Sequence, residues 1–135
     1  ASLTVMGHLV VTTQSIYKFR KYAIRVKNEE EKNRLLEDAK ILEDAGCFAI
    51  VLEKIPAELA KKVAELVDIP VIGIGAGAGV DGQVLVLHDM LGINKEFSPR
   101  FLRRYNNLFE QITTSVQEYI KDVKTVDFPN NKEQY

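Results

Sequence analysis

A carboxylate at the end of an apolar segment is the first feature of this sequence that could do chemistry. The apolar run 48–52 leads directly into Glu53, and Pro56 follows where a helix could begin. Partial removal from water disfavours the charged form of a carboxylate, which makes it a stronger general base. The alternative is structural, because Glu53 could instead cap the next helix or pair with Lys54 or Lys61. The residues alone leave both roles open.

Histidines supply the other candidate groups. His8 follows Gly7, a residue type that allows a ligand or another backbone to approach closely. A single histidine in a strand is more often a hydrogen-bonded core residue, so this alternative also stays open. His88 and Asp89 end another apolar run, which predicts a strand end comparable to that of Glu53. Glu53, His88 and Asp89 are oxygen and nitrogen donors, but their spacing matches no zinc-binding set.

The glycine-rich segment "GIGAGAGVDG", residues 73–82, contains a formal dinucleotide-binding pattern. Gly77, Gly79 and Gly82 stand at the spacing G-x-G-x-x-G. In a dinucleotide site this pattern opens a helix, whereas residues 83–89 that follow are predicted to form a strand. We therefore expect a tight turn with close backbone packing, which could also line a site.

Composition limits the class of protein. The chain has 135 residues, of which 46% are hydrophobic and 27% charged, as in a soluble globular domain. Its net charge of -1 provides no general attraction to nucleic acid or to an anionic membrane. Cys47 is the single cysteine, so no intrachain disulfide can form. With no long apolar segment and no basic leader, we expect an intracellular protein, consistent with the cytoplasm.

The elements that must position these groups follow from hydrophobic periodicity. Short apolar segments predict four strands, the first of them broken at Gly7–His8. These strands are expected at residues 3–11, 47–53, 69–77 and 83–89. Residues 12–28 are predicted to be a loop or an added short strand, and the tail from Asp127 is predicted to be exposed.

Helical spacing predicts three helices. The first is expected to run from a capping box at Asn28 and Glu31 to a glycine stop at Gly46. A second is expected over residues 56–67, with proline at its first position. The third is expected to begin at Ser98–Pro99 and to continue to about Lys124, with apolar residues at nearly heptad spacing.

Alternating strands and helices predict an α/β fold with a parallel sheet buried on both faces. In such sheets, and in (β/α)8 barrels, ligands bind at the carboxyl ends of the strands. This gives Glu53 a physical reason to follow an apolar strand directly. Four strands cannot close an eight-stranded barrel, which takes about 250 residues, so the periodicity leaves an open doubly wound sheet or half a barrel.

Several segments, taken in order, closely resemble the C-terminal half of the ketopantoate hydroxymethyltransferase family. They are "VMGHL", "TTQS", "LLEDAKILEDAGCFAIVLEKIPAELAKKV", "IPVIGIGAGAGVDGQVLVLHDMLG" and "FSPRFLRRY". Together they cover nearly the whole chain, and the run 35–92 is the most specific part. The resemblance implies parallel (βα) units that form the C-terminal half of a TIM (β/α)8 barrel, with a long C-terminal helix. Residues 1–135 would be a single domain holding strands five to eight.

The resemblance also implies an activity. The family transfers a hydroxymethyl group from 5,10-methylenetetrahydrofolate to 3-methyl-2-oxobutanoate, giving 2-dehydropantoate in pantothenate biosynthesis. Glu53 in "VLEKIP" corresponds to the catalytic base, and His8 in "MGHL" corresponds to an active-site histidine near the substrate. The family uses Mg²⁺ and assembles as a large homo-oligomer, often a decamer. Its metal carboxylates lie in the N-terminal half, so no metal ligand is expected in this chain, and little activity is expected from the chain alone.

This sequence departs from the family pattern mainly in loops at the rim. Where the family usually has "GHLGLTPQS", this chain has "GHLVVTTQS", so Val10 replaces a glycine and Thr13 a proline. Arg20 and Lys21 occupy a stretch that contains glycine in the family. Bulky and charged residues at these positions would alter the access of substrate and folate.

Three hypotheses follow. The first is a transferase half that needs a complementary N-terminal half to bind Mg²⁺. The second is a non-catalytic half-barrel scaffold or remnant that self-associates, most simply as a two-fold dimer, because one apolar sheet face would otherwise be exposed. The third is an open three-layer α/β binding domain, which would cover that face within one chain.

Overall fold

The computed structural model describes residues 3–10 and 29–135. The chain forms two compact units, residues 1–84 and 85–135. The single half-barrel domain expected over residues 1–135 stays a prediction. The capping box at Asn28 and the segment 12–28 lie outside the described residues.

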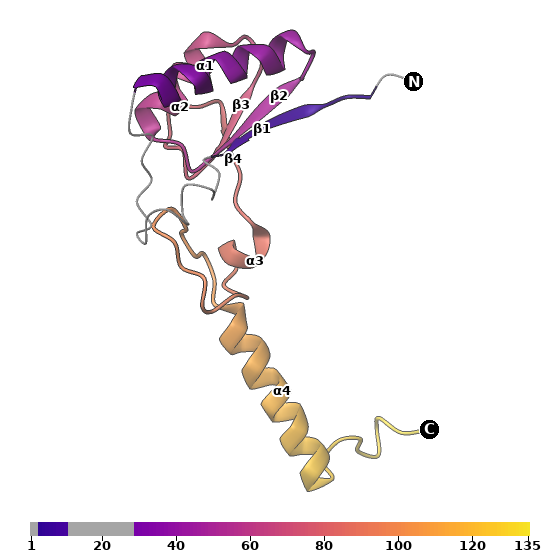
Figure 1. Cartoon of the computed structure of the whole chain (residues 1–135). Coiled ribbons are helices and arrows are strands. Elements are labelled where there is room, and N and C mark those ends of the chain that lie inside the picture. The colour runs from indigo at the N-terminus through magenta and orange to yellow at the C-terminus, as the bar shows by residue number, and fades with distance from the viewer. Residues whose placement is uncertain (1–2, 11–28) are drawn as a thin grey trace. The chain divides into compact units, whose positions relative to one another are not determined.

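The first unit is built on a four-stranded parallel sheet (Figure 1). Its strands are β1 (Met6–Val10), β2 (Ala49–Glu53), β3 (Val71–Ile74) and β4 (Gly82–Gln83), which lie side by side in this order. Strands adjacent in both sequence and space, joined by helical crossovers, are the arrangement of (βα) units. This confirms the expected α/β class and is consistent with part of a TIM barrel.

Two helices connect the first three strands. They are α1 (Glu29–Asp44) and α2 (Ala57–Leu66), close to the expected ranges. Three glutamates in the first turn of α1 stabilise this end of the helix, because their negative charges lie at the positive end of the helix dipole. Gly46, with φ +88°, ends it as expected. Pro56 is the N-cap of α2 rather than its first helical residue.

The core of this unit lies between both helices and one face of the sheet. Its buried members are Ala39, Ile50, Leu52, Ile55, Leu59, Ala60, Val63, Val67, Val71 and Ala76. Complete burial of each leucine, isoleucine or valine side chain contributes about 1.5–3 kcal/mol. A Cβ at Gly7 would lie 2.8 Å from Leu42 Cδ1, so glycine lets α1 pack closely on β1. Because β1 runs without interruption from Met6 to Val10, the expected break at Gly7–His8 is wrong.

Among the described residues of the first unit, nothing covers the opposite face of the sheet, which is called the open face. Side chains alternate between faces, so Met6, His8 and Val10 project away from the helices. Met6 and Val10 are 45% and 38% exposed, although both are apolar. Among the described residues, the expected burial of both sheet faces is therefore found for one face only. The third hypothesis, an open three-layer α/β binding domain, requires that this face be covered within one chain. The described residues of this unit do not cover it.

The strand expected at residues 83–89 is the largest error among the four expected strands. β4 contains only Gly82 and Gln83, and Leu87–Met90 form the short helix α3 of the second unit. The ladder ends where the Val84 N–H donates to the Gly73 carbonyl at 3.0 Å. Val84 and Val86 are 46% and 51% exposed, so the apolar run is not buried by a sheet. Short apolar runs do not distinguish a strand from other structures by periodicity alone.

The second unit ends in the long helix α4 (Leu108–Thr125). The helix expected from Ser98–Pro99 therefore begins ten residues later than Ser98. The backbone of this stretch bonds elsewhere, because the Tyr105 N–H donates to the Met90 carbonyl at 2.8 Å and the Leu108 N–H donates to the Leu91 carbonyl at 3.0 Å. Arg104 Nη2 also donates to three carbonyls of residues 94–97 at 2.8–3.0 Å. These bonds between separate parts of the segment override local helix propensity.

The apolar stripe of α4 is present but exposed in the structure. No residue of this helix is buried. Six apolar side chains are between 39% and 55% exposed: Phe109, Ile112, Val116, Tyr119, Ile120 and Val123. The tail 126–135 is exposed, as expected. No described helix combines the length and apolar character that a membrane span requires.

Candidate active site

His8 and Glu53 meet on the open face of the sheet. Glu53 is the last residue of β2, and His8 lies two residues before the end of β1. His8 is opposite Val51 in the parallel register, so Glu53 lies two positions further along the same face. The distance from His8 Nε2 to Glu53 Oε2 is 3.4 Å. The two residues that were singled out in the sequence are thus neighbours at the carboxyl end of the sheet.

Both side chains are accessible, to different extents. The His8 side chain is 51% exposed and that of Glu53 is 29% exposed. The separation of 3.4 Å is longer than an ordinary hydrogen bond, as is common for catalytic groups before substrate binds. A half-buried carboxylate beside an imidazole can take a proton from a bound molecule, while the ring nitrogen contacts a polar group of that molecule.

Of the structural alternatives for Glu53, which are helix capping and pairing with Lys61 or Lys54, only the pairing with Lys54 is present. Pro56, the N-cap of α2, has no side chain that can cap, and the described N–H groups of Leu59 and Ala60 donate to the Pro56 carbonyl and not to Glu53, so Glu53 does not cap this helix. Lys61 pairs with Glu65 at 3.7 Å. Lys54 does pair with Glu53, with 3.4 Å between Nζ and Oε1. The carboxylate therefore has an ion-pair partner as well as a histidine beside it.

Lys54 has a backbone conformation that no sequence pattern revealed. Its φ is +56°, in the left-handed region that non-glycine residues rarely adopt. Its N–H donates to the Ile74 carbonyl at 2.9 Å, which keeps the chain attached to β3 at this point. The sequence indicates Lys54 only as a pairing partner of Glu53, because a positive φ at a lysine leaves no signal in the sequence.

The glycine-rich segment packs against the start of α2. Gly75 and Gly77 have φ of +64° and +78°, which favours glycine at both positions. A Cβ at Gly77 would lie only 2.4 Å from Ala57 Cβ. Strand β4 follows the segment, so no helix N-terminus opens here. The glycines form the close-packed turn that was expected in place of a dinucleotide site.

His88 and Asp89 are not at a strand end, contrary to expectation. They lie in α3 of the second unit, because the apolar run before them leaves the sheet after Gln83. His88 is exposed and Asp89 is 9% exposed. Neither residue belongs to the pair formed by His8 and Glu53.

A metal site is not formed by the part of the chain that the structure describes. Within residues 3–10 and 29–135, no three His, Cys, Asp or Glu side chains are grouped in a way that could hold a metal ion. The described residues therefore supply no set of three ligands for a metal ion.

One of the four rim departures can be placed. Val10 is opposite Glu53 in the register of β1 and β2, and it is 38% exposed. The isopropyl group that stands where the family has glycine therefore lies beside the candidate base. Thr13, Arg20 and Lys21 lie outside the described residues.

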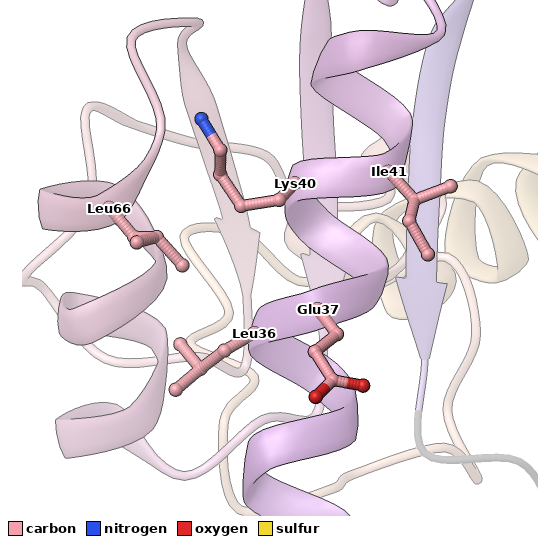
Figure 2. A pocket seen from close by; sticks show the side chains of 5 residues that line it. All are labelled: Leu36, Glu37, Lys40, Ile41 and Leu66. Carbon is pink, nitrogen blue, oxygen red and sulfur yellow. The ribbon is translucent and has the colours of Figure 1, made fainter.

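A depression lies on the helices, away from the candidate pair. Figure 2 shows it between α1 and α2, where Leu36 and Leu66 approach each other. Its lining residues are Leu36, Glu37, Lys40, Ile41 and Leu66. None of them belongs to the strand ends, and the lining is mainly apolar, so this depression is not the candidate site.

Comparison with known proteins identifies the family. The sequence profile described as "Ketopantoate hydroxymethyltransferase" matches residues 1–131. This chain belongs to the ketopantoate hydroxymethyltransferase family. Similar curated proteins are named 3-methyl-2-oxobutanoate hydroxymethyltransferase, and the one from Parabacteroides distasonis is 67% identical over 135 residues. Those from Flavobacterium johnsoniae and Bacteroides thetaiotaomicron are 64% and 58% identical over the same length.

The extent of these matches is the same for all three relatives. Each match covers 100% of this chain and 50% of the relative. The chain therefore spans about half the length of the curated ketopantoate hydroxymethyltransferases it matches. The family resemblance of the segments between Val5 and Tyr105 is confirmed, whereas the roles of Glu53 and His8 stay predictions.

Proposed function

We propose that this chain supplies the proton-abstracting half of a 3-methyl-2-oxobutanoate hydroxymethyltransferase. The complete enzyme would transfer a hydroxymethyl group from 5,10-methylenetetrahydrofolate to 3-methyl-2-oxobutanoate, giving 2-dehydropantoate for pantothenate biosynthesis. The observation that carries the proposal is the 3.4 Å approach of His8 Nε2 to Glu53 Oε2 on neighbouring parallel strands. Membership of the family and the names of the relatives support the choice of substrate.

The proposed chemistry starts with a carbon acid. The carbon next to the keto group of 3-methyl-2-oxobutanoate must lose a proton before it can form a new carbon–carbon bond. Glu53 would accept this proton as the C–H bond breaks, and the electron pair would move into the carbonyl to give an enolate. His8 would contact the substrate beside the carboxylate. The 29% exposure of Glu53 leaves the base accessible at the rim.

The complementary N-terminal half completes this proposal. Bound Mg²⁺ would stabilise the negative charge of the enolate, and its ligands would come from that half, as the family resemblance implies. 5,10-Methylenetetrahydrofolate would be the one-carbon donor. A cytoplasmic location and a homo-oligomeric assembly belong to the same proposal, with no role for nucleic acid or membrane.

The open sheet face supports a second candidate. Met6 and Val10 are 45% and 38% exposed on the face opposite the helices, and apolar residues in a strand are normally covered. The complementary half would cover this face in an enzyme. If no such half binds, a second copy of the chain would cover it, giving a non-catalytic two-fold dimer. Light scattering over a range of concentrations distinguishes a monomer from this dimer.

Turnover measurements test the enzyme directly. This chain would be assayed with 3-methyl-2-oxobutanoate, 5,10-methylenetetrahydrofolate and Mg²⁺, alone and mixed with the unmatched half of the Parabacteroides distasonis relative. We expect little turnover from the chain alone and clear turnover from the mixture. Glu53→Gln should reduce kcat of the mixture by about 10³-fold or more, because the amide is no base.

Two results would contradict the proposal. Unchanged turnover of the mixture carrying Glu53→Gln would exclude this carboxylate as the base. Substantial turnover by the chain alone would show that the site needs no complementary half. Glu58→Gln on the first turn of α2 is a matched control, since Glu58 is exposed and should leave kcat unchanged.

A further inference from the structure

Glu53 and Lys54 are consecutive residues whose charged groups nevertheless lie together. In a regular strand, consecutive side chains point to opposite faces of the sheet, so they cannot pair. Here Lys54 Nζ is 3.4 Å from Glu53 Oε1. The strand must therefore change conformation between these two residues.

The left-handed conformation of Lys54 provides this change. Its φ of +56° occurs immediately after the last residue of β2. Two contacts hold the chain on either side: the Lys54 N–H donates to the Ile74 carbonyl at 2.9 Å, and the next side chain, Ile55, is only 2% exposed. Glycine would adopt this backbone without steric cost. The chain has a lysine here and not a glycine, although the backbone is strained. This points to a use for the ammonium group.

The two oxygens of Glu53 have different partners. Oε1 faces Lys54 Nζ and Oε2 faces His8 Nε2, each at 3.4 Å. The Lys54 side chain is 43% exposed, and ion pairs of such exposure add little to folding stability. The main consequence of the pair is therefore the orientation of the carboxylate.

We infer that Lys54 is a positioning residue for the proton-abstracting step, an inference that rests on the function proposed above. The ammonium group holds Oε1 of Glu53 so that the carboxylate stays at the rim of the sheet, beside His8. The substrate proton passes to Glu53, and no bond to Lys54 forms or breaks. Correct placement of a base raises kcat, because displacements of about 1 Å can reduce the rate by up to about 10²-fold.

The test uses a full-length chimera in which residues 1–135 replace the matching half of the Parabacteroides distasonis relative, 67% identical over this length. Lys54→Met removes the ammonium group and keeps a side chain at the left-handed position. Lys54→Gly removes both the charge and the strain, and Lys54→Arg keeps the charge. We expect kcat to fall about tenfold in the first two variants with KM unchanged, and Lys54→Arg to recover most of it.

Two controls separate this inference from the proposed function and from folding. Lys62→Met removes a lysine from the exposed surface of α2 and should leave kcat unchanged. Unchanged kcat in Lys54→Met, alongside loss of activity in Glu53→Gln, would overturn the role of Lys54 alone. Unchanged kcat in Glu53→Gln would overturn the proposed function itself. If Lys54→Gly has the same kcat as the parent, or if Lys54→Arg does not recover kcat, the positive charge of residue 54 does not support the reaction.

A measurement on the chain itself requires no activity. Three-bond NMR couplings about χ1 of Glu53 report whether its side chain keeps one orientation. We expect a single rotamer in the parent and in Lys54→Arg, and averaged couplings in Lys54→Met and Lys54→Gly. Unaveraged couplings in these last two variants would show that Lys54 does not orient Glu53.

Discussion

The two units of this molecule use similar apolar periodicity with opposite results. In the first unit, helix α2 buries Leu59 and Val63 against the sheet, and Val63 is 0% exposed. In the second unit, helix α4 carries an apolar stripe of the same kind, and none of its residues is buried. A hydrophobic stripe therefore indicates which face of a helix will pack, but the partner must come from elsewhere in the fold or from another chain.

The largest expected difference between the units comes from removing one apolar side chain from each. Leu52 in β2 is 0% exposed, whereas Ile112 in α4 is 50% exposed. Leu52→Ala should lower the free energy of unfolding by about 2–5 kcal/mol, because it leaves a cavity in the core. Ile112→Ala should change it by less than about 0.5 kcal/mol. Urea denaturation, monitored by circular dichroism, measures both.

A large loss in Ile112→Ala would mean that the stripe of α4 is covered in solution, either by another part of the chain or by another copy of it. Dependence of that loss on protein concentration would identify the second possibility.

The next largest effect concerns the glycine turn beside α2. Gly77→Ala should lower the free energy of unfolding by about 1–3 kcal/mol, because its Cβ would overlap that of Ala57 and because φ there is positive. Gly46→Ala is the matched control, since its φ is +88° but no atom lies within 4 Å of the added Cβ. Thermal denaturation should show a smaller loss for Gly46→Ala. Equal losses would mean that backbone conformation alone, and not close packing on α2, requires glycine at residue 77.

The smallest effect is a pH dependence that belongs to the first unit. Lys40 donates a hydrogen bond to Glu43, and the Asp68 N–H donates another at 2.5 Å, which together hold the pKa of the Glu43 carboxyl below its ordinary value of 4.5. A lowered pKa in the folded state stabilises the fold above the pKa of the unfolded chain. This stabilisation is lost as the pH falls through the lowered pKa of the folded state.

Glu43→Gln should therefore reduce stability at neutral pH and flatten its decline under acidic conditions. Urea denaturation at neutral pH and at about pH 3.5 measures this change. Glu65→Gln is a suitable control, because Glu65 forms only an exposed pair with Lys61. If the free energy of unfolding of Glu43→Gln falls as much under acidic conditions as that of the parent, other carboxylates cause the fall.

The accuracy of the sequence-based predictions differs between the units for a physical reason. In the first unit, α1, α2 and the first three strands lie close to their expected ranges, because local propensity, capping and burial all favour the same structure there. In the second unit, the N–H groups of Tyr105 and Leu108 donate to the carbonyls of Met90 and Leu91 instead of to a preceding helical turn, which delays the helix. The apolar run after Gln83 likewise leaves the sheet. Contacts of this kind have no period in the sequence.

The candidate site was only partly predictable for the same reason. Glu53 could be identified as a candidate because a charge that follows an apolar strand is unusual, and the family motifs added His8. Lys54 could not be recognised as more than a neighbour, since its left-handed backbone depends on the bond to Ile74 and the burial of Ile55.

The sequence by itself determined the α/β class, the helices and strands around the core, the family, and the two residues that could do chemistry. Only the tertiary structure decided that His8 and Glu53 meet. Their approach depends on the register of β1 and β2, in which Val10 is opposite Glu53. Strand register is set by long-range pairing and by packing on α1 and α2, and a shift of one residue would place these side chains on opposite faces.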